Sequence, residues 1–193
     1  MFFKDIVGQK ERIADLLGEA KSGKVAHGQL FIGNEGYGTL PLALAFSRYL
    51  LCENPTDQDA CGQCSSCLQV NELQHPDLHF VYPVNTNENV KKNPISDNFS
   101  SQWRDFVIQS SYSSLYNWYQ FIGIEKKQGN ISKHEAVSIT KKLSLKSYEG
   151  GYKVLIIWMA DKMNNECANQ LLKLIEEPPD KTVLLLLTEN VEN

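Results

Sequence analysis

Residues 29–52 read QLFIGNEGYGTLPLALAFSRYLLC, and this stretch decides the fold. It begins with a short apolar run, Gln29–Ile32, of the type found in buried strands, and continues into a loop that holds three glycines. Pro41 then opens an apolar segment with the character of a helix. A buried strand, a glycine loop and a helix in direct succession are the arrangement of a phosphate-binding loop.

This loop keeps its glycines but not the side chains that act on phosphate. A working loop reads GxxxxGK[ST]: backbone amides surround the phosphates, the lysine reaches the β- and γ-phosphates, and the hydroxyl group binds Mg²⁺. Here Thr39 stands at the lysine position and Leu40 at the hydroxyl position. We therefore expect a degenerate cradle that holds an anion weakly or not at all, through backbone amides alone. Its residues are Gly33, Gly36, Gly38 and Thr39.

The composition limits the classes to which the chain can belong. Its 193 residues can form one good-sized core, and 42% hydrophobic with 22% charged residues is typical of a soluble globular protein. Nineteen basic against 23 acidic residues give a net charge of −4, which provides no positive field for direct binding of nucleic acid. There is no secretory signal and no run of about 18 apolar residues, so we expect no membrane span and a cytoplasmic location.

Strand-like and helix-like segments alternate along the rest of the chain. Further apolar runs of strand type are Phe80–Val84, Val154–Met159 and Thr182–Leu187. The run from Val154 is continuous and rich in β-branched residues, which is typical of a central parallel strand. Segments with helical periodicity are Lys10–Ala20, Ile131–Lys142 and Asn164–Ile175. This alternation predicts an α/β fold with a parallel sheet flanked by helices, and it places the glycine loop at the ligand-binding edge of the sheet.

Four of the five cysteines lie close together, as Cys-x8-Cys-x2-Cys-x2-Cys. They are Cys52, Cys61, Cys64 and Cys67. Four thiolates suit tetrahedral zinc and leave no position open for water, so this spacing predicts a structural zinc site in a small insertion, residues 52–67. Free thiols, a redox pair or an iron–sulfur cluster are the alternatives. Cys167 lies on an apolar helix face and is expected to be a buried core residue.

Residues 85–124 do not fit the α/β pattern and form an unassigned, aromatic-rich insertion. Its first part, to about Ser101, is rich in asparagine and predicts an exposed loop. The second part carries the aromatic residues Trp103, Phe106, Tyr112, Tyr116, Trp118, Tyr119 and Phe121. We expect a helical insertion that packs its rings on the main core, with a patch for a binding partner as the alternative.

The strand-like run from Val154 lacks the acid that a nucleotide hydrolase needs. In such enzymes a strand of this type ends with an aspartate that orders Mg²⁺. Trp158 and Met159 occupy the corresponding places, and Asp161 falls too far along the chain. The lysine, the hydroxyl and the acid are thus missing at three separate places. We predict no catalytic residue, negligible hydrolysis and no ATP as a cofactor.

Several motifs carry a resemblance to a known family. They are Asp5–Gln9 (DIVGQ), His27, the degenerate loop from Gly33, the cysteine insertion, His75–Asp77 (HPD) and Asn169–Pro179 (NQLLKLIEEPP). Together they resemble the bacterial clamp-loader subunits of DNA polymerase III, which are AAA+ proteins with a zinc-binding insertion. In that family the gamma and tau subunits keep a working phosphate loop, whereas the delta-prime subunit typically does not. The losses at Thr39 and Trp158 therefore place this chain nearer to delta-prime.

The resemblance implies that residues 1–193 are the AAA+ domain of a scaffold subunit that works in a hetero-pentamer with gamma or tau and delta subunits. That assembly opens the sliding clamp and loads it on primed DNA. The family's Ser-Arg-Cys motif and its lid and collar domains are missing, so we expect a fragment that comprises the first domain. Thr188 lies near the family's sensor position, although ending a strand is an equally good role. An active gamma-type ATPase and a zinc-stabilised nucleic-acid-binding module remain the alternative functions.

Overall fold

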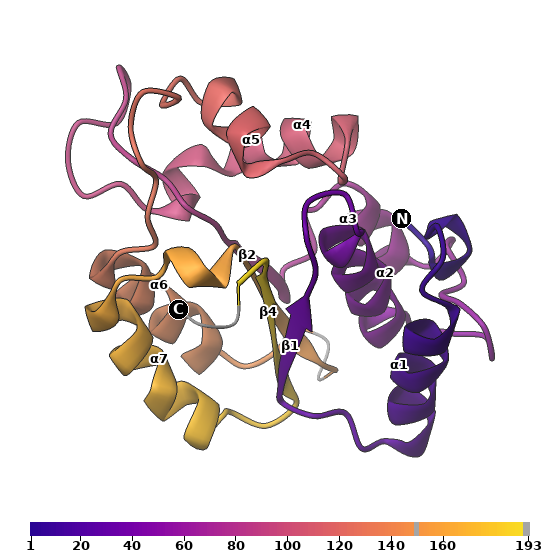
Figure 1. Cartoon of the computed structure of the whole chain (residues 1–193). Helices are drawn as coiled ribbons and strands as arrows, with labels where there is room; N and C mark the ends of the chain where they lie inside the picture. Colours follow the sequence, from indigo (N-terminus) through magenta and orange to yellow (C-terminus); the bar gives the residue numbers. More distant parts are fainter. Residues whose placement is uncertain (149–150, 191–193) are drawn as a thin grey trace.

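The computed structural model describes residues 1–148 and 151–190. Within them a four-stranded parallel sheet carries helices on both faces (Figure 1). The strands are β1 (Gly28–Ile32), β2 (Leu78–Val81), β3 (Lys153–Trp158) and β4 (Thr182–Thr188). The α-helices are α1 (Lys10–Ser22), α2 (Thr39–Leu51), α3 (Ser65–Asn71), α4 (Ser100–Gln109), α5 (Leu115–Phe121), α6 (Lys133–Ser144) and α7 (Asn165–Glu176). Short 3₁₀ helices are η1 (Phe3–Asp5), η2 (Ser96–Phe99) and η3 (Ala160–Lys162).

The strand order β1-β4-β3-β2, with every pairing parallel, confirms the predicted α/β fold. Helices α1, α2 and α3 lie on one side of the sheet and α6 and α7 on the other, with α4 and α5 above them (Figure 1). All residues of β3 are buried, as predicted for a central strand covered on both faces. The predicted strands that begin at Val154 and Thr182 lie within one residue of β3 and β4.

The first strand is not the buried strand that its sequence predicts. β1 pairs only with β4, so it forms an edge of the sheet in the described part of the chain. Leu30 and Ile32 lie on its open face, and 51% and 56% of their surfaces are exposed. Phe31 points to the opposite face and packs against the core there. An apolar run of this kind can form either an edge strand or a central strand, because its exposure depends on which elements pack beside it. The sequence of the run alone therefore does not predict that it is exposed.

The insertion also differs in part from its prediction. Its polar half is not wholly an exposed loop, because Ser96 and Phe99 are buried and η2 leads directly into α4. The side chains of Asn85 and Asn87 hold the remaining loop by donating to the carbonyl groups of Gln128 and Ile122, at 2.6 and 3.0 Å. Trp103, Phe106 and Trp118 of the aromatic half are buried in the main core.

Glu135 on α6 fastens the insertion to the body of the domain. One carboxylate oxygen accepts the backbone N–H of Ser96 at 2.7 Å. The other oxygen is buried without a hydrogen-bond partner among the described residues. Burial raises the pKa of Glu135 to about 7, although the N–H of Ser96 and the charge of Lys142 oppose the effect and Asp97 adds to it. The folded domain therefore favours the protonated form of this acid.

Because of this raised pKa, Glu135 should contribute less to the stability of the fold as the pH rises. Between its ordinary value of 4.5 and about 7, folded Glu135 keeps a proton that the unfolded chain has released. At about 1.4 kcal/mol per pH unit, the contribution of Glu135 to the free energy of unfolding should drop by on the order of 3 kcal/mol across this window. Glu135→Gln keeps an acceptor for Ser96 and should remove that slope. Urea unfolding of both proteins at pH 5 and pH 8 measures the difference, and identical pH dependence would contradict it.

Candidate phosphate cradle and metal centre

The glycine loop, residues 33–39, connects β1 to α2 at the carboxyl edge of the sheet and is called the cradle below. The N–H of Gly33 donates to the carbonyl of Thr188 at 3.1 Å, which ties the loop to the end of β4. Gly36 and Gly38 have φ angles of +81° and +82°, a conformation that glycine adopts without strain. The backbone therefore turns tightly between β1 and α2 at these two glycines.

The helix that follows the cradle offers few groups to an anion. Thr39 and Leu40 occupy the first two positions of α2, and Pro41 at the third position has no N–H. The methyl group of Thr39 turns back into the loop, where it would lie 2.9 Å from a Cβ added at Gly33. The positive end of the helix dipole remains, but no lysine follows Gly38 to meet a phosphate.

The end of β3 holds an aromatic side chain where a hydrolase carries its magnesium acid. Trp158 is 3% exposed, and its ring centroid lies 5.2 Å from that of Trp103 in α4. Asp161, two positions beyond Met159, is engaged elsewhere: one oxygen lies 3.1 Å from the hydroxyl of Thr188 and the other 2.7 Å from Nζ of Lys162. Asp161 and Thr188 therefore hold the ends of β3 and β4 together.

Acidic groups near the cradle form a cluster that the sequence does not suggest. Glu189 lines the cradle from the end of β4. Burial raises the pKa of Glu189, and the negative charges of Glu35 and Asp161 raise it further. A negative potential at this place works against binding of phosphate. The three residues are far apart in the sequence, so only the fold reveals the cluster.

A residue from the insertion lies against the cradle. The ring of Tyr112 covers Gly38 so closely that a Cβ added there would lie 3.1 Å from Cε1 of the ring. The Tyr112 hydroxyl accepts the backbone N–H of Val7 at 3.4 Å. The aromatic residues Trp103, Phe106 and Trp118 of the same insertion are buried in the core, and nothing in the composition of the insertion distinguishes Tyr112 from them.

The four clustered cysteines meet at the far end of α2 from the cradle. Cys52 follows α2, Cys61 lies in the next loop, and Cys64 and Cys67 lie at the start of α3. Their Sγ atoms are all within 4.8 Å of one another, and the Cys52–Cys64 and Cys61–Cys67 pairs are both 4.0 Å apart. Tetrahedral zinc with Zn–S bonds of about 2.3 Å holds its sulfurs about 3.8 Å apart. The four thiols thus have the spacing of a Cys₄ zinc site.

Backbone groups around the cysteines also suit a metal centre. The N–H groups of Cys61 and Cys67 lie 3.3 and 3.4 Å from the sulfurs of Cys52 and Cys64. Burial raises the pKa of Cys52 to about 12, whereas backbone N–H groups of Gln63 and Cys64 lower the pKa of Cys61 to about 6. A bound cation would stabilise all four thiolates. Cys167 is fully buried on the other side of the sheet, as the sequence predicts.

Comparison with known proteins identifies the family. The sequence profile described as "DNA polymerase III, delta subunit" matches residues 8–193. The chain belongs to this family. Family members similar to it include DNA polymerase III subunit delta' of Pseudomonas aeruginosa, 28% identical over 84% of this chain and 37% of the relative. The subunit delta' of Bacillus subtilis is 27% identical over 97% of this chain and 44% of the relative.

These family members confirm the resemblance that the sequence motifs indicate. The chain spans about two fifths of the length of both delta' relatives, 37% and 44%. A solved structure of a gamma subunit-related protein from Thermotoga maritima covers 90% of this chain and 38% of its own, with 15% identity and a TM-score of 0.47. Among the helices of residues 1–148 and 151–190, none has the length and apolarity needed to cross a bilayer.

Proposed function

We propose that residues 1–193 form the AAA+ domain of a non-hydrolysing, delta-prime-type subunit of the DNA polymerase III clamp loader. The family match and the delta' relatives support this assignment. The observation that carries the non-hydrolysing role is the state of the cradle. Thr39 replaces the phosphate-binding lysine, Leu40 replaces the magnesium-binding hydroxyl residue, and Trp158 occupies the place of the magnesium acid.

In this proposal the subunit is a scaffold that other subunits work against. It assembles with gamma or tau and delta subunits in a hetero-pentamer in the bacterial cytoplasm, and it meets the sliding clamp and primed DNA through that complex. Similarity to proteins named as delta', tau and gamma subunits supports the choice of partners. The net charge of −4 favours an indirect route to DNA over direct binding by this domain.

The proposal includes a structural zinc ion in the insertion, residues 52–67. Cys52, Cys61, Cys64 and Cys67 would supply its ligands. Four protein ligands leave no coordination position for water or substrate, so the ion would crosslink the chain and take no part in a reaction. The observed sulfur separations and the N–H groups directed at the sulfurs support this assignment.

The protein alone should release no phosphate from ATP above background. Each absent group would stabilise either the phosphate charge or Mg²⁺, so their joint loss removes the means of catalysis. A phosphate-release assay with Mg²⁺ measures this, with the loader's own ATP-binding subunit as the positive control. Turnover by this chain would favour the alternative of an active gamma-type ATPase.

Assembly tests the scaffold role separately. The full-length protein should co-elute with gamma or tau and delta subunits and should be required for loading of the clamp on primed DNA. Failure to co-assemble would contradict the proposal. DNA binding by this domain alone, with an affinity that falls steeply as salt rises, would favour the nucleic-acid-binding alternative instead.

A further inference from the structure

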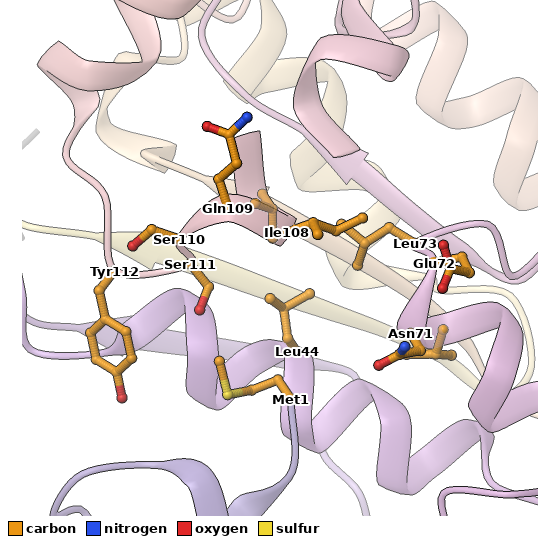
Figure 2. A pocket seen from close by; sticks show the side chains of 12 residues that line it. Met1, Leu44, Asn71, Glu72, Leu73, Ile108, Gln109, Ser110, Ser111 and Tyr112 are labelled. Atoms are coloured by element: carbon orange, nitrogen blue, oxygen red, sulfur yellow. The ribbon is translucent and has the colours of Figure 1, made fainter. Parts of the chain in front are cut away.

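The segment that joins α4 to α5, residues 110–114, lies beside the beginning of α2. Figure 2 shows Ser110, Ser111 and Tyr112 of this segment opposite Leu44 of α2 and Met1, on the rim of a pocket of about 380 Å³. The other side of the segment faces the cradle, because residues 111–113 line it together with Gly36, Gly38 and Met159. We call residues 110–114 the plug segment.

Tyr112 of the plug segment lies against the cradle. Its ring covers Gly38, which is buried although the four residues before it, 34–37, are exposed. Its hydroxyl group reaches the backbone N–H of Val7 at 3.4 Å. The side chain therefore bridges the cradle and the segment before α1, across the space that a ligand on the loop would have to enter.

The volume left between the plug segment and the cradle is too small for a nucleotide. It amounts to about 20 Å³. A single water needs about 10–15 Å³ by the same measure, so the space holds one water and no triphosphate. A second hollow that reaches Gly38 lies between α1 and β1, and there Asp15 and Glu19 outnumber the positive charge of Arg12. Neither space suits a polyphosphate.

Aromatic packing fixes the helices on both sides of the plug segment. The ring of Trp158 lies 5.2 Å from Trp103 and 6.3 Å from Phe106 of α4, centroid to centroid. Trp118 of α5 lies 5.2 Å from Trp103. Ser114, the last residue of the plug segment, caps α5 by accepting the N–H of Asn117 at 3.1 Å. Trp158, which occupies the position of the magnesium-binding acid, therefore belongs to the surface on which the insertion packs.

We propose that the cradle is the docking site of the chain's own plug segment, and that Tyr112 excludes nucleoside triphosphates from it. The inference rests on the proposed non-hydrolysing function, and it adds a second reason why the cradle does not bind nucleotide. Loss of the lysine weakens affinity for phosphate, whereas the plug segment removes the space. The proposal also gives the 85–124 insertion a role. The insertion fills the phosphate-binding loop of its own chain, which in proteins with a working loop of this type holds the nucleotide phosphates.

Two substitutions separate the missing lysine from the occupied space. Thr39→Lys restores the phosphate-binding side chain, and Tyr112→Ala opens the cradle. Binding of MgATP and of inorganic pyrophosphate is measured by calorimetry for Thr39→Lys, for Tyr112→Ala and for the double variant. We expect the double variant to bind at least tenfold more tightly than Thr39→Lys alone. Tyr116→Ala is the matched control, because Tyr116 belongs to the same insertion but is 59% exposed, and it should give Thr39→Lys no gain.

A second measurement does not depend on the variants. In the unaltered protein, nuclear Overhauser contacts should join the Tyr112 ring protons to the α-protons of Gly38. Their absence would overturn the inference, and so would a folded double variant that binds no better than Thr39→Lys. ATP turnover by the unaltered protein is a different failure, because it contradicts the proposed function whether or not the Tyr112 contacts are found.

Discussion

If the four cysteines hold the proposed zinc ion, replacing Cys67 by alanine should abolish zinc binding and unfold residues 52–67. Cys67 is fully buried and its sulfur lies 4.0 Å from that of Cys61. Without it three thiolates remain and the tetrahedral site cannot close. A structural zinc contributes on the order of 10 kcal/mol of apparent folding free energy, which is comparable to the whole stability of a typical domain.

Metal analysis and thermal unfolding measure this effect. Because one structural zinc ion takes four protein ligands, the unaltered protein should carry about one zinc per chain, and the variant should carry almost none. Cys167→Ala is the matched control, since it also removes a buried thiol but lies on the opposite side of the sheet, away from the site. This variant should keep the metal, and its free energy of unfolding should fall by about 1 kcal/mol. Unaltered protein that is metal-free and equally stable would refute the assignment.

Loss of the proposed zinc ion should also disturb the packing of residues outside the insertion. The ring of Phe2 lies so close to Gly62 that a Cβ added there would be 2.6 Å from it. The guanidinium of Arg48, in α2, lies 3.9 Å from the centre of the same ring, and Arg48 as a residue is 3% exposed. An unfolded cysteine turn would uncover this arginine and the start of the chain.

The features that could be predicted from the sequence are those set by local pattern. β3 and β4 are long apolar runs whose neighbours in sequence are helices, so their type and approximate bounds follow from the residues alone. The cysteine cluster is equally local, because its spacing brings three sulfurs into one turn. The missing lysine at Thr39 can be read directly, since the loop motif fixes the position.

The features that could not be predicted depend on contacts between distant segments. Leu30 is exposed because β1 has one neighbouring strand in the described residues, and strand composition does not reveal this. Tyr112 meets Gly38 through a contact between two segments that no periodicity connects. The raised pKa of Glu135 likewise requires that Ser96, from the insertion, closes over α6. In each case the sequence gives the identity of the residue, but it does not predict which distant residues pack against it.

Trp103→Ala should lower the free energy of unfolding by about 3–5 kcal/mol, the range for large-to-small changes in a core. Trp103 is 1% exposed, and its ring stacks on Tyr82 with centroids 4.0 Å apart. It also contacts Trp118 and Trp158, both at 5.2 Å. Urea unfolding followed by far-ultraviolet circular dichroism measures the change. Tyr116→Ala, at an exposed position of the same insertion, should stay within about 0.5 kcal/mol.

Trp103→Phe distinguishes ring packing from the polar group of the indole. The indole Nε1 of Trp103 is buried without a hydrogen-bond partner in residues 1–148 and 151–190, and such a group opposes folding by about 1–3 kcal/mol. Phenylalanine keeps an aromatic ring and removes this N–H, so it should cost much less than alanine. A Trp103→Ala protein as stable as Tyr116→Ala would mean that α4 is not docked on Trp158. The plug segment would then lose its anchor, and the exclusion of nucleotide by Tyr112 would lose its structural basis.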